Sequence, residues 1–118
     1  MELILQVNHH ELIAELVDNS STKALIELLK ISPQIINMKD YLHFEKVGEL
    51  NVALPRNDES FTTEAGDLIL YLGNKFVIYY DTNHYRFMRL GKIKNVIQKE
   101  LIEILGPSDV VVKISLKG

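Results

Sequence analysis

Apolar and polar positions alternate along the start of the chain, with one interruption. Leu3, Leu5 and Val7 share one face of an extended segment, and the alternation resumes over residues 12–16 after the polar segment 8–11. Because a short polar connection between two alternating segments is typical of a β-hairpin, we predict that these two segments pair.

Helical spacing begins after this hairpin. Residues 18–21, Asp-Asn-Ser-Ser, offer side-chain acceptors to the free N–H groups of a first helical turn, and apolar residues recur at helical spacing from Ala24 to Leu29. Since the residue before a proline disfavours helical backbone angles, we predict a helix of about ten residues that ends before Pro33.

The middle of the chain combines short extended segments with loops. We predict strands at 34–39 and 44–49 and a further extended piece at 51–54, whereas the polar, proline-marked residues 55–60 predict a surface loop. Two apolar runs follow, at 67–72 and 75–80. They flank a Gly-Asn pair that tolerates positive φ, which favours a tight antiparallel hairpin.

The last third contains a strand, a helix and a strand. Residues 81–84 predict a loop and 87–93 a strand, after which Asn95 and Gln98 resemble the two ends of a capping box. The apolar stripe of the following helix comprises Ile97, Leu101, Ile104 and Leu105. Gly106 and Pro107 end the helix, and the alternating run 110–116 predicts a half-buried strand that pairs with the first strand.

These elements predict a mainly β fold. Eight short strands can enclose one core, and closure of the sheet removes exposed strand edges. We therefore expect a closed, antiparallel, eight-stranded β-barrel with two α-helices, formed by residues 1–118 as a single domain.

Composition narrows the chemistry. The 118 residues include no cysteine, which excludes disulfides, thiolate nucleophiles and cysteine-based metal sites. The longest apolar runs have five residues, against about 20 for a membrane helix, and the N-terminus carries an acidic residue where a secretory signal would carry a basic one. We expect a cytoplasmic protein with no membrane partner.

The order of elements resembles the cyclophilin fold, and more closely the small bacterial family of cyclophilin-like proteins. The matching segments span most of the chain in the family's order: 14–19 (AELVDN), 23–29 (KALIELL), 40–41 (DY), 45–46 (EK), 66–67 (GD) and 90–93 (LGKI). Residues 88–94, the second helix and the last strand also resemble the closing segment of true cyclophilins, which are peptidyl-prolyl isomerases.

The resemblance implies a test for catalytic residues. In true cyclophilins an arginine on a strand after the first helix contacts the prolyl peptide, and a phenylalanine, a histidine and a tryptophan line the proline pocket. This chain has no arginine between its first helix and Leu54 and no tryptophan, while Val77 falls where the phenylalanine is expected and Phe87 falls near the histidine. We therefore expect a binding domain without isomerase activity. The alternative is a divergent prolyl isomerase.

One set of polar and aromatic residues predicts a binding cleft at strand ends and in a loop. It comprises Tyr41, Glu45, Lys46, Tyr80, His84 and Arg86. Binding residues often lie on loops held by a rigid scaffold, so we expect this set to bind an extended peptide or a small ligand. The alternative is a structural ion pair formed by Glu45 or Lys46, with the tyrosines packed on the barrel surface.

Other candidate chemistry is weaker. His9 and His10 are adjacent on a turn and would point apart, while His43 and His84 have no ligand spacing around them, so we expect neither a metal ion nor another cofactor. The basic segment 86–99 could contact an acidic partner through salt-sensitive binding. The net charge of −3 disfavours nucleic acid as that partner, and the sequence leaves the oligomeric state open.

Overall fold

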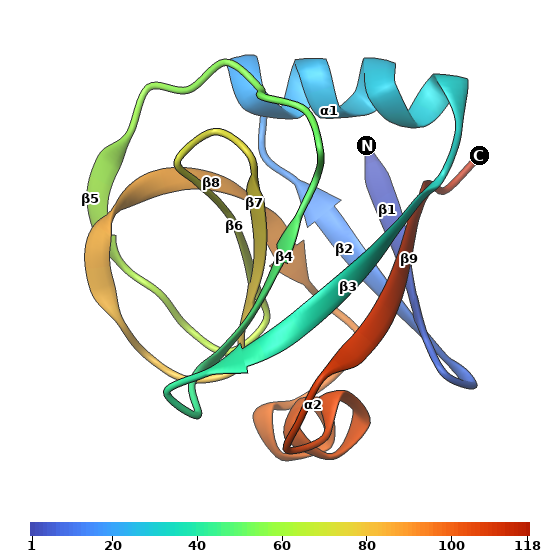
Figure 1. Cartoon of the computed structure of the whole chain (residues 1–118), viewed down its shortest axis with the longest axis vertical. Coiled ribbons are helices and arrows are strands. Elements are labelled where there is room, and N and C mark those ends of the chain that lie inside the picture. Colours follow the sequence, from blue (N-terminus) through green and yellow to red (C-terminus); the bar gives the residue numbers. More distant parts are fainter.

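Eight antiparallel strands close into a barrel in the computed structural model, which describes residues 1–118 (Figure 1). The barrel strands are β1 (Glu2–Val7), β2 (His10–Leu16), β3 (Gln34–Tyr41), β4 (Glu45–Glu49), β6 (Asp67–Tyr71), β7 (Lys75–Tyr79), β8 (His84–Ile93) and β9 (Val110–Leu116). Their order around the barrel is β2-β1-β9-β3-β4-β7-β6-β8, and the pairing of β8 with β2 closes it. The expected eight-stranded barrel with two helices is confirmed.

The first hairpin and the closing strand follow the sequence pattern. Leu5 pairs with Leu12 across the β1–β2 hairpin and with Ile114 of β9 on its other side. The inward positions Leu3, Leu5 and Val7 are completely buried. Alternation of side chains along a strand thus decides which face of each segment lines the core.

Closure between β2 and β8 depends on a close approach of two backbones. A Cβ atom added at Gly91 would lie 2.3 Å from the carbonyl oxygen of Glu15, far inside van der Waals contact. Gly91 pairs with Leu16, so the glycine lies at the seam where the barrel closes.

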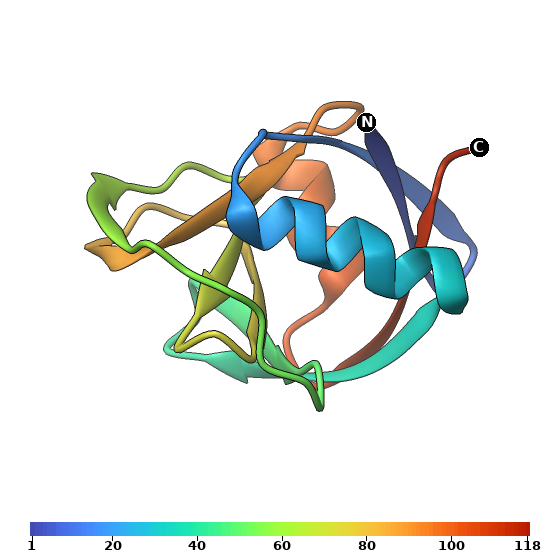
Figure 2. The ribbon, with the colours of Figure 1, turned by 90° about the horizontal axis from the view of Figure 1, so that it is seen from above.

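One helix covers each end of the barrel (Figures 1 and 2). α1 (Ser20–Ile31) lies across the upper end, where Leu25 and Leu29 join the main core, and α2 (Gln98–Leu105) inserts Leu101 and Leu105 from the lower end. Asn19 caps α1 by accepting a 2.9 Å hydrogen bond from the Thr22 amide, in agreement with the predicted start. Neither helix is long and apolar enough to cross a membrane.

The predicted capping box of the second helix is wrong. α2 begins at Gln98, and Glu100 reaches back to the amide of Ile97 at 3.3 Å. Asn95 instead accepts a 2.9 Å hydrogen bond from the amide of Ile13, on the neighbouring hairpin. A tertiary contact has taken the side chain that local spacing assigned to the cap, and Ile97, expected on the buried stripe, is exposed.

The strand predictions differ from the structure on either side of the polar loop. Residues 51–54 form no strand. β5 (Glu59–Thr62) begins within the predicted loop 55–60, and β8 begins at His84, the last residue of the predicted loop 81–84. β5 pairs with β8 alone, outside the barrel, and its Phe61 packs against Phe87 with ring centroids 4.9 Å apart. Because β8 is ten residues long, its first half extends beyond β6 and offers a free edge to β5.

Candidate functional site

The hairpin strands β6 and β7 are apolar on both faces. On β7, Phe76 and Ile78 point into the barrel, while Val77 and Tyr79 point outward and are almost equally buried. The outward side chains form a second cluster separate from the main core: Ile69, Val77, Tyr79 and Phe87, with Phe44, Val47, Phe61 and Tyr71 packed against them. This part of the wall therefore carries an apolar outer surface.

A pocket of about 530 Å³ lies on this outer surface, and nine of its twelve lining residues are hydrophobic. We call it the aromatic pocket. Six aromatic side chains line it, namely Tyr41, Phe44, Tyr71, Tyr79, Tyr85 and Phe87. They come from β3, the β3–β4 turn, β6, β7 and β8, so the pocket is built by segments far apart in sequence.

Contacts between neighbouring rings hold the aromatic pocket in shape. Phe44 stacks on Tyr79 with centroids 5.9 Å apart, and Phe87 meets Tyr79 edge-on at 5.7 Å. On the opposite wall Tyr71 and Tyr85 form another edge contact at 5.9 Å. Such offset and edge-to-face arrangements are the favoured geometries of aromatic pairs, so these contacts stabilise the arrangement of the lining.

Glu45 places a carboxyl group in this apolar lining. Its side chain is only 8% exposed, and burial raises the pKa of the Glu45 carboxyl, an effect that the nearby Asp40 carboxylate strengthens and the Tyr79 hydroxyl partly offsets. Asn83 donates a 3.1 Å hydrogen bond to the Tyr79 hydroxyl and supplies the other polar group at this end. Lys75 also lines the pocket, but its ammonium lies 2.6 Å from the Glu49 carboxylate.

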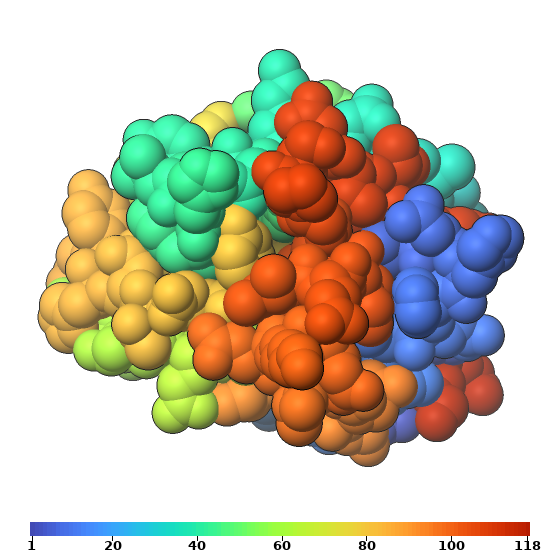
Figure 3. Space-filling view, turned by 90° about the horizontal axis from the view of Figure 1, so that it is seen from below, coloured from blue at the N-terminus to red at the C-terminus, as the bar shows by residue number.

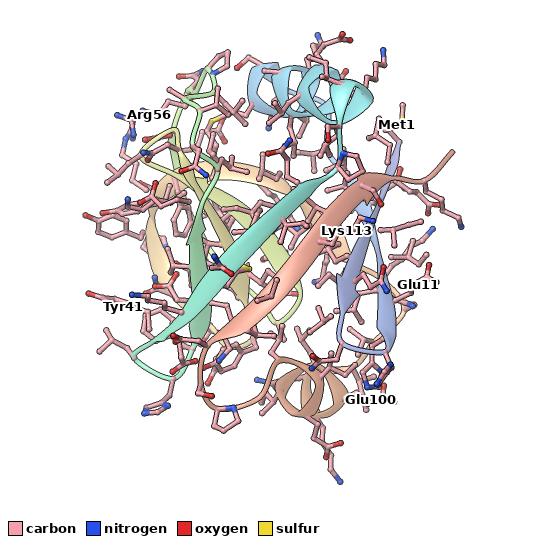
Figure 4. The ribbon with its side chains drawn as sticks, turned by 45° about the vertical axis from the view of Figure 1, so that its right-hand side comes forward. Met1, Glu11, Tyr41, Arg56, Glu100 and Lys113 are labelled. Atoms are coloured by element: carbon pink, nitrogen blue, oxygen red, sulfur yellow. The ribbon has the colours of Figure 1, made fainter.

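The structure divides the six residues of the predicted cleft among three places. Tyr41 and Glu45 line the aromatic pocket, and Tyr41 lies at its exposed rim (Figure 4). Lys46 and Tyr80 follow outward-facing Glu45 and Tyr79 and therefore point to the inner side of the wall. His84 and Arg86 lie on β8 beside β5 and do not line the pocket.

Lys46 and Tyr80 form a buried polar cluster with Asp40. The Lys46 ammonium, which is completely buried, donates to the Asp40 carboxylate at 3.1 Å and to the Ser108 carbonyl at 2.6 Å. The Tyr80 hydroxyl donates to the same carboxylate oxygen. Burial would raise the pKa of Asp40, but the hydrogen bonds from Tyr80 and Lys46 outweigh it and lower that pKa. For Lys46, the structural ion pair is the interpretation that the structure supports.

The remaining predicted residue types are dispersed. A 2.8 Å hydrogen bond joins His84 Nδ1 to the Thr62 hydroxyl, and His43 Nδ1 lies 3.3 Å from the Asp40 carboxylate. These two histidines therefore contact different partners. No group of three or more His, Asp or Glu side chains is placed to hold a metal ion. In the expected position of the isomerase pocket, Val77 and Phe87 do line the aromatic pocket, while no arginine does.

Three of the five basic residues in the segment 86–99 form ion pairs. Arg89 pairs with Asp67 at 3.2 Å, Lys92 with Glu64 at 2.5 Å, and Lys94 with Glu2. Hydrogen bonds and charge from Lys92 lower the pKa of the exposed Glu64 carboxyl. Arg86 and Lys99, the other two basic residues of the segment, form no ion pair.

Most of the aromatic lining was missed from the sequence. Phe44, Tyr71, Tyr79 and Tyr85 were absent from the predicted cleft, although the apolar runs 67–72 and 75–80 carried a signal for Tyr71 and Tyr79. A strand that is apolar at every position is expected to be buried on both of its faces. The inner face covers the barrel core, and the outer face forms this pocket.

Seen from below, α2 lies between the turn of the first hairpin and the segment that joins β3 to β4 (Figure 3). Residues 80–85 lie beside this β3–β4 segment. The Tyr80 amide donates to the Phe44 carbonyl at 3.0 Å and ties these two segments together. This hydrogen bond links Phe44, which lines the aromatic pocket, to the residue that follows Tyr79.

Comparisons with known proteins agree with this architecture. No curated protein and no solved structure gives a significant match to the chain. A protein-family model described as the cyclophilin-like family matches residues 5–115. Because that match extends from the first strand to the last, the protein belongs to the cyclophilin-like family.

Proposed function

We propose that this protein is a binding domain whose aromatic pocket takes up part of a peptide or a small molecule, without prolyl isomerisation. The observation that carries the proposal is the preformed pocket of about 530 Å³ on the outside of the barrel, with nine hydrophobic residues among twelve. Concave, mostly apolar sites with a few placed polar groups are the usual form of ligand pockets.

Exposure at the rim supports binding over a purely structural role. Tyr41, Leu42 and Tyr85 are each more than half exposed, whereas Tyr79 and Phe87 in the same lining are buried. Exposed aromatic side chains around a recess mark interaction sites, because covering them removes apolar surface from water. Their tight ring contacts also limit the entropy lost on binding.

The polar groups of the pocket argue against isomerisation. Rotation about a prolyl bond must cross a barrier of about 18–20 kcal/mol, and lowering it requires a donor aimed at the twisted amide. The cation in the lining, Lys75, already pairs with Glu49 at 2.6 Å, and Asn83 donates to Tyr79. The carboxyl group of Glu45 would face a peptide carbonyl with an acceptor where a donor is needed.

Nuclear magnetic resonance with a panel of short peptides and small molecules tests binding. We expect ligand-induced shifts to cluster at residues of the aromatic pocket. A Val47→Phe variant, which fills the recess, should remove these shifts, whereas Val111→Phe on the exposed face of β9 should keep them. Shifts that cluster elsewhere, or persist in a folded Val47→Phe variant, would contradict the proposal.

An exchange assay on X-Pro peptides tests the absence of catalysis. We expect the cis/trans exchange rate to stay at its uncatalysed value at protein concentrations that saturate binding. Turnover well above background that disappears in Val47→Phe would overturn this part of the proposal and establish the divergent isomerase instead.

A further inference from the structure

We infer that the aromatic pocket recognises an alkylated ammonium group, such as a trimethylammonium, through the faces of its aromatic rings and the carboxylate of Glu45. This inference rests on the proposed binding function and names the chemical class of the ligand. It follows from three properties of the pocket: its aromatic rings, its one carboxylate without a cationic partner, and its apolar lining.

The first property is the number of rings. Six aromatic side chains line the recess, four of them tyrosines, and neighbouring rings meet at interplanar angles between 14° and 78°. A cation near the face of a ring is attracted by the ring quadrupole, and cages of aromatic rings bind quaternary ammonium groups in this way.

The second property is the charge in the lining. Glu45 and Lys75 are its two charged residues, and the Lys75 ammonium is neutralised by Glu49, which leaves the Glu45 carboxylate without a cationic partner. The nearby Asp40 carboxylate is paired with Lys46 on the inner side of the wall. The local field therefore favours a cation over an anion or a neutral group.

The third property is the apolar character of the recess. Transfer of a bare ammonium into such a site loses strong hydration, and the pocket offers only the Glu45 carboxylate, the Tyr79 hydroxyl and the Asn83 amide in exchange. An alkylated ammonium holds its water weakly and brings methyl groups that pack on rings. It thus matches both the apolar lining and the charge of Glu45.

Matched probes separate charge from shape. Choline and 3,3-dimethylbutan-1-ol have nearly the same shape, but only choline carries the positive charge. We expect choline to quench tyrosine fluorescence, since four of the five tyrosines line the pocket and the chain has no tryptophan, and to shift pocket resonances. The neutral alcohol should bind at least about tenfold more weakly.

Two variants test the contributions of the Glu45 charge and of the Tyr85 ring to choline binding. Glu45→Gln keeps the side-chain shape and removes the charge, and it should weaken choline binding by about tenfold while leaving the affinity for the neutral alcohol unchanged. Tyr85→Leu removes one ring from the exposed rim and should weaken choline binding severalfold. Glu27→Gln, which removes a charge from the outer face of α1, is the matched control and should bind like the wild type.

The outcomes distinguish this inference from the proposed function. Equal affinity for choline and its neutral isostere, or full choline binding by a folded Glu45→Gln variant, would overturn the ammonium specificity and leave the pocket as a binding site. The same follows if uncharged peptides alone shift the pocket resonances. If no probe shifts these resonances, the ammonium inference and the binding function both fail.

The same titration identifies the source of the ammonium group. A peptide with an ε-trimethyl-lysine and the same peptide with norleucine at that position are compared with free choline. Tighter binding of the trimethyl-lysine peptide than of choline indicates a modified protein as the natural ligand. Equal or weaker binding indicates a free quaternary amine, and norleucine binding as tight as trimethyl-lysine counts against the inference.

Discussion

The Lys46 ammonium lies 3.1 Å from the carboxylate of Asp40 inside the barrel wall, where the lysine side chain is completely buried and the aspartate is 11% exposed. The two residues face each other near the turn of the β3–β4 hairpin, in which Asp40 pairs with Lys46. Their polar cluster lies directly behind the aromatic pocket, because adjacent Glu45 projects from the opposite face of β4. The ion pair therefore supports the strand that carries the carboxylate of the pocket.

Replacement of Lys46 by methionine should destabilise the protein by about 3–5 kcal/mol. The change leaves the Asp40 carboxylate with the Tyr80 hydroxyl and the exposed His43 ring but no buried cation beside it, and it removes the donor to the Ser108 carbonyl. Urea unfolding measures the loss. The exposed Lys30–Glu27 pair provides the control, since Lys30→Met should change stability far less. A similar loss in both variants would contradict a special role for Lys46.

Stability should depend on the ionisation of Asp40. Its pKa is lowered in the folded state, so the carboxylate stabilises the fold above its ordinary pKa of about 3.9, and this contribution is lost as the pH falls through the lowered folded-state value. We expect Asp40→Asn to be about 2–4 kcal/mol less stable than the wild type at pH 7. The difference should narrow below about pH 4 in urea titrations. A difference independent of pH would show that the charge is unimportant.

Glu45→Gln should have the opposite effect on stability. Because burial raises the pKa of Glu45, ionisation of this group opposes folding at any pH above its folded-state pKa. The variant should therefore unfold with a free energy about 0.5–1 kcal/mol higher than the wild type at pH 7, and no higher at acid pH where the carboxyl is protonated. Thermal melts at both pH values measure this. Lower stability of the variant at pH 7 would assign Glu45 a structural role.

Gly91→Ala should open the seam of the barrel. The new methyl group would lie 2.3 Å from the backbone oxygen of Glu15, which can move only if β2 and β8 separate. We expect a loss of about 2–4 kcal/mol and faster amide exchange at the β2–β8 pairs. Gly118→Ala, at an open position, serves as the control. Unchanged protection at Ala14 and Leu16 would contradict this account of closure.

Much of the fold follows from local sequence patterns. The alternation at Leu3, Leu5 and Val7, the cap at Asn19 and the final strand at 110–116 were all predicted correctly, because each depends on neighbours within a few residues. β5 and the start of α2 were not. Both are decided by partners distant in sequence: the free edge of β8 for β5, and the amide of Ile13 for Asn95.

The candidate site was predicted less completely than the fold. Tyr41 and Glu45 were selected as polar or aromatic residues at strand ends, and they do line one pocket. Lys46 and Tyr80 were grouped with them as further polar or aromatic residues at strand ends. Adjacent residues on a strand face opposite sides, so the same segment supplies one residue to the pocket and the next to the buried ion pair.

The sequence by itself determined that this cysteine-free chain would form a barrel with two helices, because the spacing of apolar residues specifies which faces must be buried. Only the tertiary structure decided what those buried faces cover. Closure of the barrel brings β3, β4, β7, β6 and β8 side by side, so rings far apart in sequence meet over Val77 and enclose the carboxyl group of Glu45. Such a pocket depends on long-range pairing, which local sequence patterns do not contain.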